Sequence, residues 1–422
     1  MGKAETILVL GSGGREHAIC WHLESRKYDV ICSPGSDAIS RIAKTHPLED
    51  FKKLADYCKK EGIIEVIVGP EKYLAEGVSD FLTAEGLSVF GPTQSAARLE
   101  TDKAWAKDFC IRHKIPTARS ATITDIAELK DALMNFKPPF VIKASGLAQG
   151  KGVWIGSDWE EALRFSESAL REHRALVIEE FIEGEEISYF SLVDGEKHLF
   201  LGAAQDHKRL LENDRGPNTG GMGAYSPTPQ LTTELQEKIE KKVVEKVLAG
   251  LKADKIEYRG FLFLGFMIHK SEPYLLEFNC RLGDPETQAL MMRLDDSLLE
   301  LIRSLKTDKP RTAKMKNGVS LNAVIAARGY PENPASGFAL EKIDEVPADL
   351  VVFHSGTKLK DKEWTATGGR LFSVNVFKDS LLECQQAIYP WIETFSFHKN
   401  ITYRRDIGVK AYRHLLDQND YA

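Results

Sequence analysis

The composition is that of a soluble globular protein with an acidic balance. The 422 residues include 56 Lys and Arg against 62 Asp and Glu, a formal net charge of -6, and 43% of them are hydrophobic. At roughly 100–200 residues per domain, this length predicts two to four folded units. No apolar run approaches the roughly 20 residues of a membrane span, which argues against a membrane protein. The acidic balance argues against nucleic acid as a partner, because binding to the phosphate backbone depends on clustered Lys and Arg.

The cysteines and the first residues point to a cytoplasmic protein. Six scattered cysteines, without a Cys-x-x-Cys pair or a His at zinc spacing, argue against disulfides and structural zinc. The opening Met-Gly-Lys-Ala-Glu-Thr matches the myristoylation pattern formally, but strand residues begin at once with Ile7. No signal peptide precedes this strand, so export is not expected. The lack of an obvious exposed apolar helix favours a monomer.

The chain begins with a strand, a glycine-rich turn and a helix. Residues 7–10 are apolar, Gly11-Ser12-Gly13-Gly14 follow, and a helical pattern continues to Leu23. Further apolar runs at residues 29–31, 65–68 and 88–90 alternate with helical stretches, as in a parallel sheet with right-handed crossovers. An N-terminal α/β domain is therefore predicted over residues 1–103.

The first glycine turn resembles a dinucleotide-binding fingerprint but lacks two of its features. Glu16 stands where the third glycine belongs, and no acidic residue closes the second strand, because Ile31 leads into Cys32. We therefore reject a dehydrogenase. The start of the helix still offers free N–H groups and the positive end of its dipole, so the turn is either an anion site or a structural turn.

A compact α+β lobe that binds a nucleotide is predicted next. A helix at residues 103–113 leads to a strand at 140–143, a helix at 159–171 and a strand at 176–179. Between them lies a second turn with three glycines.

This second turn follows Lys143 and holds Gly146, Gly150 and Gly152. It is not a Walker A loop, because Gly152 rather than Ser or Thr follows Lys151. Its glycines would let the backbone approach nucleotide phosphates, and Lys143 on a strand would direct a charge at them. Taken alone, the pattern also fits an ordinary β-turn.

A polar segment at residues 206–225 is too long to be a simple connector, so we expect it to be functional. It combines acids, cations and a glycine cluster. Lys208 and Arg209 would neutralise a transferring phosphoryl group, and the glycine-rich part would close over it. His207 is interpreted as positional rather than catalytic.

Alternation along the run 274–281 predicts a metal site. The strand period of two places Glu277, Asn279 and Arg281 on one face, while Leu276 and Phe278 point into the core. Mg²⁺ prefers oxygen ligands and keeps waters and substrate phosphates in its shell, so a carboxylate and an amide form a sufficient partial site. A half-exposed edge strand would show the same alternation, and the neighbouring phosphate-binding lobe favours the metal.

The last part of the chain reads as a third unit. This unit comes after a charged helix at 233–252 and a strand pair at 261–269 and 273–278. From residue 313 onwards, short strands alternate with turns before a final helix. They are predicted at residues 319–326, 351–353 and 370–376, with the helix at 379–391.

These segments, in this order, resemble the phosphoribosylamine-glycine ligase (glycinamide ribonucleotide synthetase) family of purine biosynthesis, part of the ATP-grasp superfamily. The likeness extends essentially from end to end and is most specific in the run Gly-Pro-Asn-Thr-Gly-Gly-Met-Gly-Ala-Tyr and in the motif that begins Asn-Cys-Arg. It rests on residues 9–18, 68–71, 179–181 with 184–186, 206–209, 216–225, 279–281 with 283–288, and 404–408.

The resemblance implies a mixed α/β and α+β multidomain fold. It would comprise a parallel N-terminal α/β (pre-ATP-grasp) domain over 1–103, an ATP-grasp domain over 104–312 with its nucleotide lobe at about 118–190, and a small C-terminal domain over 313–422. ATP would lie between two lobes, together with Mg²⁺ or Mn²⁺. The implied substrates are glycine and 5-phosphoribosylamine.

The resemblance also assigns roles to single residues. Those implied for ATP are Lys103, Lys143, Gly146, Gly150 and Gly152 at the phosphates, the backbone of Glu179, Phe181 and Ile182 at adenine, and Glu186 at the ribose. Glu277 and Asn279 would hold the metal. We assign catalysis to Lys143, Lys208, Arg209 and Arg281, and the substrates to Gly13, Gly14, Arg15, Glu71, Asp206, Asp214, Asn218 and Arg281.

In the implied reaction, the glycine carboxylate attacks the γ-phosphate and the amine of phosphoribosylamine then displaces phosphate from glycyl phosphate. Positioning and electrostatics supply most of such catalysis. One alternative is an ATP-grasp carboxylate-amine ligase with another acid or amine. A second is a nucleotide-binding protein without turnover, against which the retention of Lys143, Glu277 and Asn279 counts.

The sequence departs from the family's usual pattern at a few positions. Ser145 stands where the family usually has Asp, and Asp102 replaces a usual Ser before the lysine at the start of the helix. Ser36 stands for a usual Asn, and Lys72-Tyr73 replace a small residue and Pro. Most of these positions are expected near the nucleotide or the amine, so substrate affinity or identity is open to change there.

Overall fold

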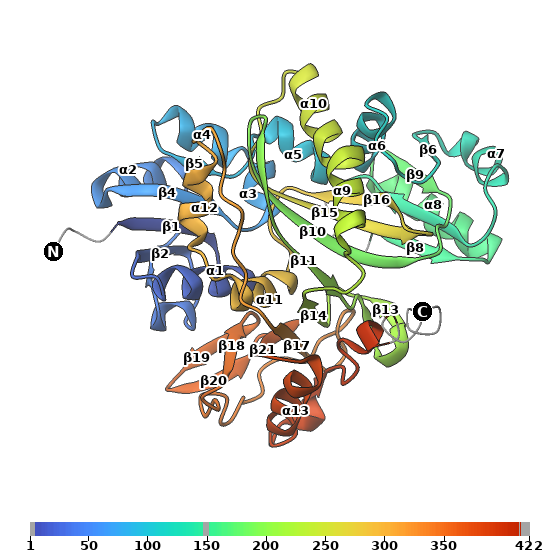
Figure 1. Cartoon of the computed structure of the whole chain (residues 1–422). Coiled ribbons are helices and arrows are strands. Elements are labelled where there is room, and N and C mark those ends of the chain that lie inside the picture. Colours follow the sequence, from blue (N-terminus) through green and yellow to red (C-terminus); the bar gives the residue numbers. More distant parts are fainter. Residues whose placement is uncertain (1–4, 147–151, 413, 415–422) are drawn as a thin grey trace.

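Three large β-sheets organise residues 5–146, 152–412 and 414, the part of the chain that the computed structural model describes (Figure 1). The first sheet is parallel, in the order β3-β2-β1-β4-β5. All six residues of β1 are buried, as expected for a central strand that is covered on both faces. The strands are β1 (Thr6–Gly11), β2 (Asp29–Pro34), β3 (Lys44–Thr45), β4 (Ile63–Val68) and β5 (Val89–Phe90).

Five helices connect and flank this sheet: α1 (Gly14–Glu24), α2 (Phe51–Glu61), α3 (Glu71–Ala75), α4 (Val78–Ala84) and α5 (Gln94–Thr101). Helix α2 shows the expected local signals, because the Asp50 side chain accepts the Lys53 N–H at its start and Gly62 ends it with a left-handed backbone. The predicted parallel α/β arrangement of the N-terminal part is confirmed.

An antiparallel four-stranded sheet forms a separate lobe, on the right of Figure 1. Its order is β6-β9-β7-β8, and helices α7 and α8 pack on it around a small core of its own that includes Ile142, Leu163 and Ile178. The elements are α6 (Lys103–Arg112), β6 (Ser120–Ile123), α7 (Leu129–Met134), β7 (Phe140–Ala144), β8 (Val153–Gly156), α8 (Trp159–Glu172) and β9 (Leu176–Glu179). This is the α+β lobe that the sequence predicts.

The third sheet is antiparallel and runs through the middle and the lower part of the molecule (Figure 1). Its order is β16-β15-β10-β11-β14-β17-β21-β18, and β22 pairs with β17. One sheet therefore crosses residue 313, where the C-terminal domain is predicted to begin, and that boundary stays a prediction. The strands are β10 (Glu185–Asp194), β11 (Lys197–Asp206), β14 (Gly223–Ser226), β15 (Arg259–His269), β16 (Glu272–Asn279), β17 (Val319–Ala327), β18 (Leu350–His354), β21 (Arg370–Lys378) and β22 (Ile401–Thr402).

Two apolar cores fix the first sheet on the third. One core joins Leu8, Phe109 and Leu264, and the other joins Val9, Phe190 and Leu290. The helices involved include α9 (Thr233–Ile239) and α10 (Glu245–Ala253), which a π turn at Glu240–Val244 joins, and α11 (Glu286–Arg293) and α12 (Leu298–Ser304). The C-terminal part adds α13 (Leu381–Ile392) and the hairpin of β19 (Thr357–Lys360) and β20 (Glu363–Ala366).

The polar segment 206–225 is more ordered than the loop expected from its sequence. It holds a small hairpin of β12 (Arg209–Leu211) and β13 (Arg215–Asn218), and then β14 in the large sheet. The hairpin lies outside the large sheets and has mostly exposed or half-exposed residues, so no apolar alternation marks it. Among the described residues, no helix combines the length and the apolar character that crossing a bilayer requires.

Candidate active site

A cavity of about 180 Å³ lies where the first sheet's helices, the four-stranded lobe and strand β16 meet. It is lined by charged side chains of both signs and by a few apolar ones. Nine of the residues that the sequence singles out line it, namely Glu71, Lys103, Lys143, Gly146, Gly152, Glu179, Glu277, Asn279 and Arg281. Residues 200 positions apart in the sequence thus face one space.

Three lysines line this cavity. Lys143 of β7 lies 3.0 Å from a Glu179 carboxylate oxygen and donates to the Leu276 carbonyl over 2.9 Å. Lys107 lies 3.1 Å from the other oxygen of Glu179, so this acid bridges two lysines. Lys103 donates to the Gly146 carbonyl over 2.9 Å, and burial lowers its pKa although Glu277 favours the charged form.

Lys107 was not among the residues singled out from the sequence. It is four residues beyond Lys103, on the same face of α6, so helical spacing could have indicated it. Burial lowers its pKa, and Glu179 opposes that shift. Three lysine ammonium groups therefore line the cavity. An anion that enters it would compete for them with the carboxylate of Glu179, which already pairs with two of them.

Strand β16 brings Glu277 and Asn279 to the cavity wall by alternation, but the alternation breaks just before them, at Leu276. The pairing with β15 shifts between Gly265 and Phe266, so that Gly265 faces Glu277 while Phe266 faces Leu275. Leu276 is the extra residue of this β-bulge. The expectation that Leu276 points into the core is wrong, because the bulge makes Leu275 and Phe278 the buried core residues.

The donor set on this wall suits a hard cation. Burial opposes the charge of Glu277, but Lys208, Lys143, Lys103 and Arg281 together lower its pKa, so the carboxylate is ionised at neutral pH. The Asn279 Nδ2 atom is buried without a hydrogen-bond partner among the described residues, so this amide is not committed to the fold. A carboxylate and an amide oxygen on one wall are ligands that Mg²⁺ or Mn²⁺ accepts.

Arg281 joins two helices of the first unit to the end of β16. Its Nε lies 3.2 Å from Glu71 at the start of α3, and its Nη2 lies 2.8 Å from Glu100 of α5. Glu100 also accepts the Cys280 N–H over 2.7 Å, and burial raises its pKa although Arg281 opposes the shift. No local pattern indicated Glu100, because its partner Arg281 is 181 positions away.

Lys208 reaches the acids of two strands of the large sheet. Its Nζ lies 2.7 Å from Glu186 of β10 and 3.6 Å from Glu277 of β16. Asp206, two residues earlier, is buried, and this raises its pKa to about 7 although Lys208 opposes the shift. Arg209 instead donates to the Gly216 carbonyl across the hairpin over 2.9 Å.

Several other predicted site residues lie outside the cavity. Glu186 is held by Lys208, and the Phe181 side chain, 41% exposed, lies with Ile182 between β9 and β10. Asn218 pairs with Arg209 in the hairpin. Gly150 lies outside the described residues. Their assignment to nucleotide or substrate stays a prediction.

Asp214 takes part in an ion-pair network at the turn that connects the two strands of the hairpin. Arg404 Nη1 lies 2.9 Å from one of its oxygens and Lys410 Nζ lies 2.7 Å from the other. Arg404 also donates to Asp406. Lys410 and Arg404 together lower the pKa of Asp214 to about 2, although burial opposes this shift. These contacts anchor the hairpin to the C-terminal part of the chain.

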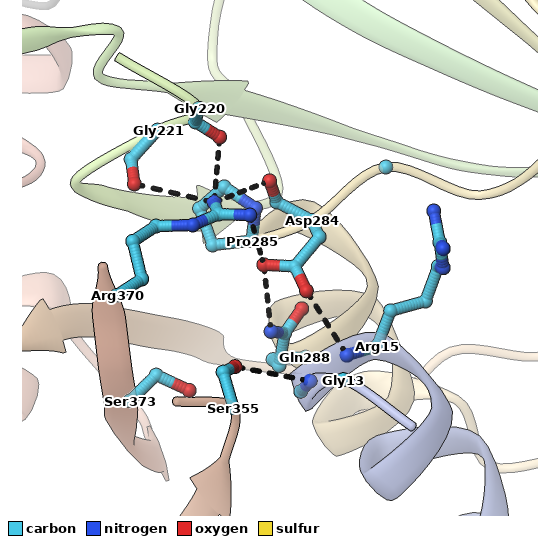
Figure 2. Close-up of polar contacts among 12 residues, drawn as sticks. Gly13, Arg15, Gly220, Gly221, Asp284, Pro285, Gln288, Ser355, Arg370 and Ser373 are labelled. Atoms are coloured by element: carbon cyan, nitrogen blue, oxygen red, sulfur yellow. Dashed lines mark hydrogen bonds and ion pairs between the residues drawn. The ribbon is translucent and has the colours of Figure 1, made fainter. Parts of the chain in front are cut away.

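Groups of the protein itself occupy the first glycine turn, as Figure 2 shows. The Gly13 N–H donates to Glu16 over 2.8 Å, the Gly14 N–H to the Ser355 hydroxyl over 3.1 Å and the Arg15 N–H to Asp284 over 3.1 Å. A side chain at Gly14 would collide with Gln288 and Ser355, each 2.8 Å from an added Cβ. In this structure the turn packs closely against its neighbours, and the N–H groups of Gly13, Gly14 and Arg15 already have acceptors.

Arg370 connects the same point to the glycine-rich segment. Its guanidinium donates to the Gly220 carbonyl over 2.6 Å and to the Asp284 carbonyl over 2.7 Å, and lies 3.2 Å from the Asp284 carboxylate (Figure 2). Asp284 thus joins helix α1, the segment at Gly220 and strand β21. This places all three predicted units at one junction.

Three family models match this chain in succession. Their descriptions are the N domain of phosphoribosylglycinamide synthetase over residues 5–100, its ATP-grasp (A) domain over 101–287 and its C domain over 320–410.

Curated relatives match over almost the whole chain. The phosphoribosylamine-glycine ligase of Ralstonia nicotianae is 40% identical over 96% of this chain and 99% of its own length, and that of Xanthomonas campestris is 41% identical over 96% and 97%. The trifunctional purine biosynthetic protein adenosine-3 of Chironomus tentans is 39% identical over 96% of this chain, which spans 31% of that longer protein.

Solved structures show the same architecture. The phosphoribosylamine-glycine ligase of Thermotoga maritima has a TM-score of 0.84 at 34% identity and covers 96% of this chain and 100% of its own. Biotin carboxylase of Campylobacter jejuni, at 14% identity, has a TM-score of 0.73 over 96% of this chain and 94% of its own, which concerns the fold alone. The mixed α/β fold with a parallel N-terminal sheet and an ATP-grasp part is confirmed.

Proposed function

Because the chain belongs to the phosphoribosylglycinamide synthetase family, we propose that it uses ATP to join glycine to 5-phosphoribosylamine, giving glycinamide ribonucleotide, ADP and phosphate in de novo purine biosynthesis. The observation that carries this proposal is the cavity in which Lys103, Lys107 and Lys143 face Glu277 and Asn279. Cations for phosphates and oxygen ligands for a divalent ion are the two requirements of phosphoryl transfer.

We assign the ATP phosphates to the space beside Lys103, Lys143, Gly146 and Gly152. Glu179 fixes the ammonium of Lys143 from one side, and the Leu276 carbonyl fixes it from another. A lysine held in this way costs little reorganisation when charge develops on a transferring phosphoryl group. The backbone from Glu179 to Ile182 would then receive adenine, and Glu186 the ribose.

Glu277 and Asn279 would hold Mg²⁺ or Mn²⁺, which supplies positive charge at the phosphate oxygens when bound. The low pKa of Glu277 supports this assignment, because the carboxylate needs no deprotonation before it can bind a cation. Lys208 would then balance the charge of Glu277 and Glu186 and lie close to the transferring group.

The reaction has two steps. A glycine carboxylate oxygen attacks the γ-phosphorus and the bond to the β–γ bridging oxygen breaks, which yields ADP and glycyl phosphate. The amine of phosphoribosylamine then attacks the acyl carbon, the C–O bond to phosphate breaks, and the amine loses a proton as the amide forms. We assign the amine substrate to the side of Arg281 and Glu71, where the first unit meets β16.

The hairpin that follows Lys208 lies close to these groups and would limit the access of water, which would otherwise hydrolyse the acyl phosphate. We further propose that the enzyme acts as a cytoplasmic monomer that binds small molecules alone. Light scattering of the purified chain tests the monomer.

The experiment that tests the function measures ADP release with MgATP, glycine and freshly generated phosphoribosylamine, with each component omitted in turn. We expect release to require both substrates. Release that ignores glycine or the amine would point to an ATP-grasp ligase with a different acid or amine, and nucleotide binding without release would point to a protein without turnover.

A further inference from the structure

A hydrogen-bonded pair joins the start of helix α6 to the end of strand β7 beside the cavity. The Ser145 hydroxyl donates to Asp102 Oδ1 over 2.9 Å and accepts the Ala104 N–H over 3.0 Å. The same oxygen of Asp102 accepts the Trp105 N–H over 3.0 Å and so caps α6. One side chain therefore serves as helix cap and as link to another element.

The two elements that the pair joins carry two of the lysines of the cavity. Lys103 directly follows Asp102, and Lys143 precedes Ser145 by two residues. A second link lies next to the first, because Lys103 Nζ donates to the Gly146 carbonyl. The backbone of Ser145 is also fixed, since its N–H donates to the Ala175 carbonyl over 2.9 Å. The pair thus sets the position of Lys103 against the turn that follows Lys143.

We propose that Asp102 and Ser145 are positioning residues that hold Lys103 and the backbone at Gly146 in register for the phosphates of ATP, and that the acid and the hydroxyl can exchange places. This inference rests on the proposed function. Neither side chain lines the cavity, so both act through their neighbours.

Exchanging the residue types at positions 102 and 145 would preserve the hydrogen bonds between the two elements. Serine and aspartate are both good helix caps, so a serine at position 102 would still accept the Trp105 N–H. An aspartate at position 145 would accept both the Ala104 N–H and the hydroxyl of that serine. Each single change breaks this arrangement: Ser145→Asp places two carboxylates face to face, and Asp102→Ser leaves two hydroxyls without the charge-assisted bond.

The test is a double-mutant cycle of Asp102→Ser, Ser145→Asp and the double variant, read by calorimetric titration with MgADP. We expect Ser145→Asp to weaken nucleotide binding at least about tenfold and Asp102→Ser about three- to tenfold, as expected for loss of a charge-assisted hydrogen bond. The double variant should return to within about threefold of the parent. Single effects that add up in the double variant would overturn the proposal.

Asp158→Ser is the matched control. Asp158 caps α8 in the same lobe by accepting the Glu161 N–H over 2.8 Å, a hydrogen bond that lies within the first turn of its own helix. The control should leave the affinity for MgADP unchanged. A loss in the control equal to that in Ser145→Asp would contradict a positioning role, and the melting temperature of each variant shows whether it folds.

Turnover separates this inference from the proposed function. Where ATP is consumed, the single variants should raise the KM for ATP more than they lower kcat, and the double variant should restore KM. A parent enzyme that binds MgADP but shows no glycine-dependent release would refute the proposed reaction and still allow the cycle to be read. If the parent has full activity but the double variant does not regain the parent's KM, only the positioning role of Asp102 and Ser145 is refuted.

Discussion

The ammonium of Lys208 lies 2.7 Å from the Glu186 carboxylate, and on its other side it faces Glu277 at 3.6 Å. Burial opposes the charge of this lysine, but Glu186, Asp206 and Glu277 together raise its pKa well above the usual range. Lys208 is therefore charged at neutral pH. Its partners are the two acids that we assign to the ribose and to the metal.

Replacing Lys208 with Met should lower kcat at least about a hundredfold, because one preorganised charge at a developing anion is typically worth a factor of 10²–10³. The measurement is ADP release under saturating substrates. Lys241→Met is the control, since Lys241 is an exposed lysine in the π turn between α9 and α10. Activity near that of the parent would remove Lys208 from the catalytic groups.

Glu277→Gln should lower the rate at least about a hundredfold and raise the Mg²⁺ concentration needed for half-maximal activity, because the amide is a weaker ligand for a hard cation. Glu272→Gln is a matched control on the same strand. Glu272 is paired with Lys238 and Lys242 away from the cavity, so its loss should leave the metal dependence unchanged. An unchanged metal dependence in Glu277→Gln would contradict the metal assignment.

Periodic patterns in the sequence predicted the main elements and part of the cavity. Glu277 and Asn279 were predictable because they alternate along one strand, and Lys143 because a glycine turn follows its strand. The bulge at Leu276 was not predictable, because it arises from the pairing of β16 with β15 and the residue types of β16 do not indicate it. Contacts between distant segments were likewise invisible.

Two further residues show where local patterns end. Glu100 gains its place from Arg281, 181 positions later, and no helical or strand period connects them. The Arg15 N–H in the first glycine turn looked open to an anion, but Asp284, 269 positions later, accepts its hydrogen bond. Tertiary packing decides both cases.

Asp206 should make the stability of the fold depend on pH. Burial raises its folded pKa to about 7, against about 3.9 for an aspartate in the unfolded chain. Between these two values the folded state binds more protons than the unfolded state, so this group lowers the free energy of unfolding as pH rises from 4 to 7. Above pH 7 the Asp206 carboxylate is ionised in both states, so the destabilisation that it causes no longer changes with pH.

Asp206→Asn removes this titration. The variant should therefore be more stable than the parent at pH 8, by an amount on the order of a few kcal/mol that shrinks as the pH falls toward 4. Urea unfolding at pH 5, 6, 7 and 8 measures the difference. A difference that stays constant across this range would show that Asp206 is ionised throughout it.

Arg404 should be a major contributor to the stability of the C-terminal part. Its side chain is 1% exposed, lies 2.7 Å from Asp406 and 2.9 Å from Asp214, and donates to the Arg209 carbonyl over 3.0 Å. It therefore ties the β12–β13 hairpin to the end of the chain. Removing one partner of a fully buried ion pair typically costs about 3–5 kcal/mol, and this range is an upper limit here because the Asp214 and Asp406 side chains are 38% and 18% exposed.

Arg404→Met should accordingly lower the free energy of unfolding by up to about 3–5 kcal/mol in urea titration. Arg405→Met is the neighbouring control, because Arg405 and its partner Glu393 are 57% and 49% exposed and such pairs contribute about 0–1 kcal/mol. The hairpin begins at Arg209, next to Lys208, so Arg404→Met should also raise the KM for ATP or lower kcat at temperatures where the variant remains folded. If the two variants were equally stable, Asp214 and Asp406 would have other partners that compensate their charge in Arg404→Met. Lys410, 2.7 Å from Asp214, would be the first such partner to replace in a further variant.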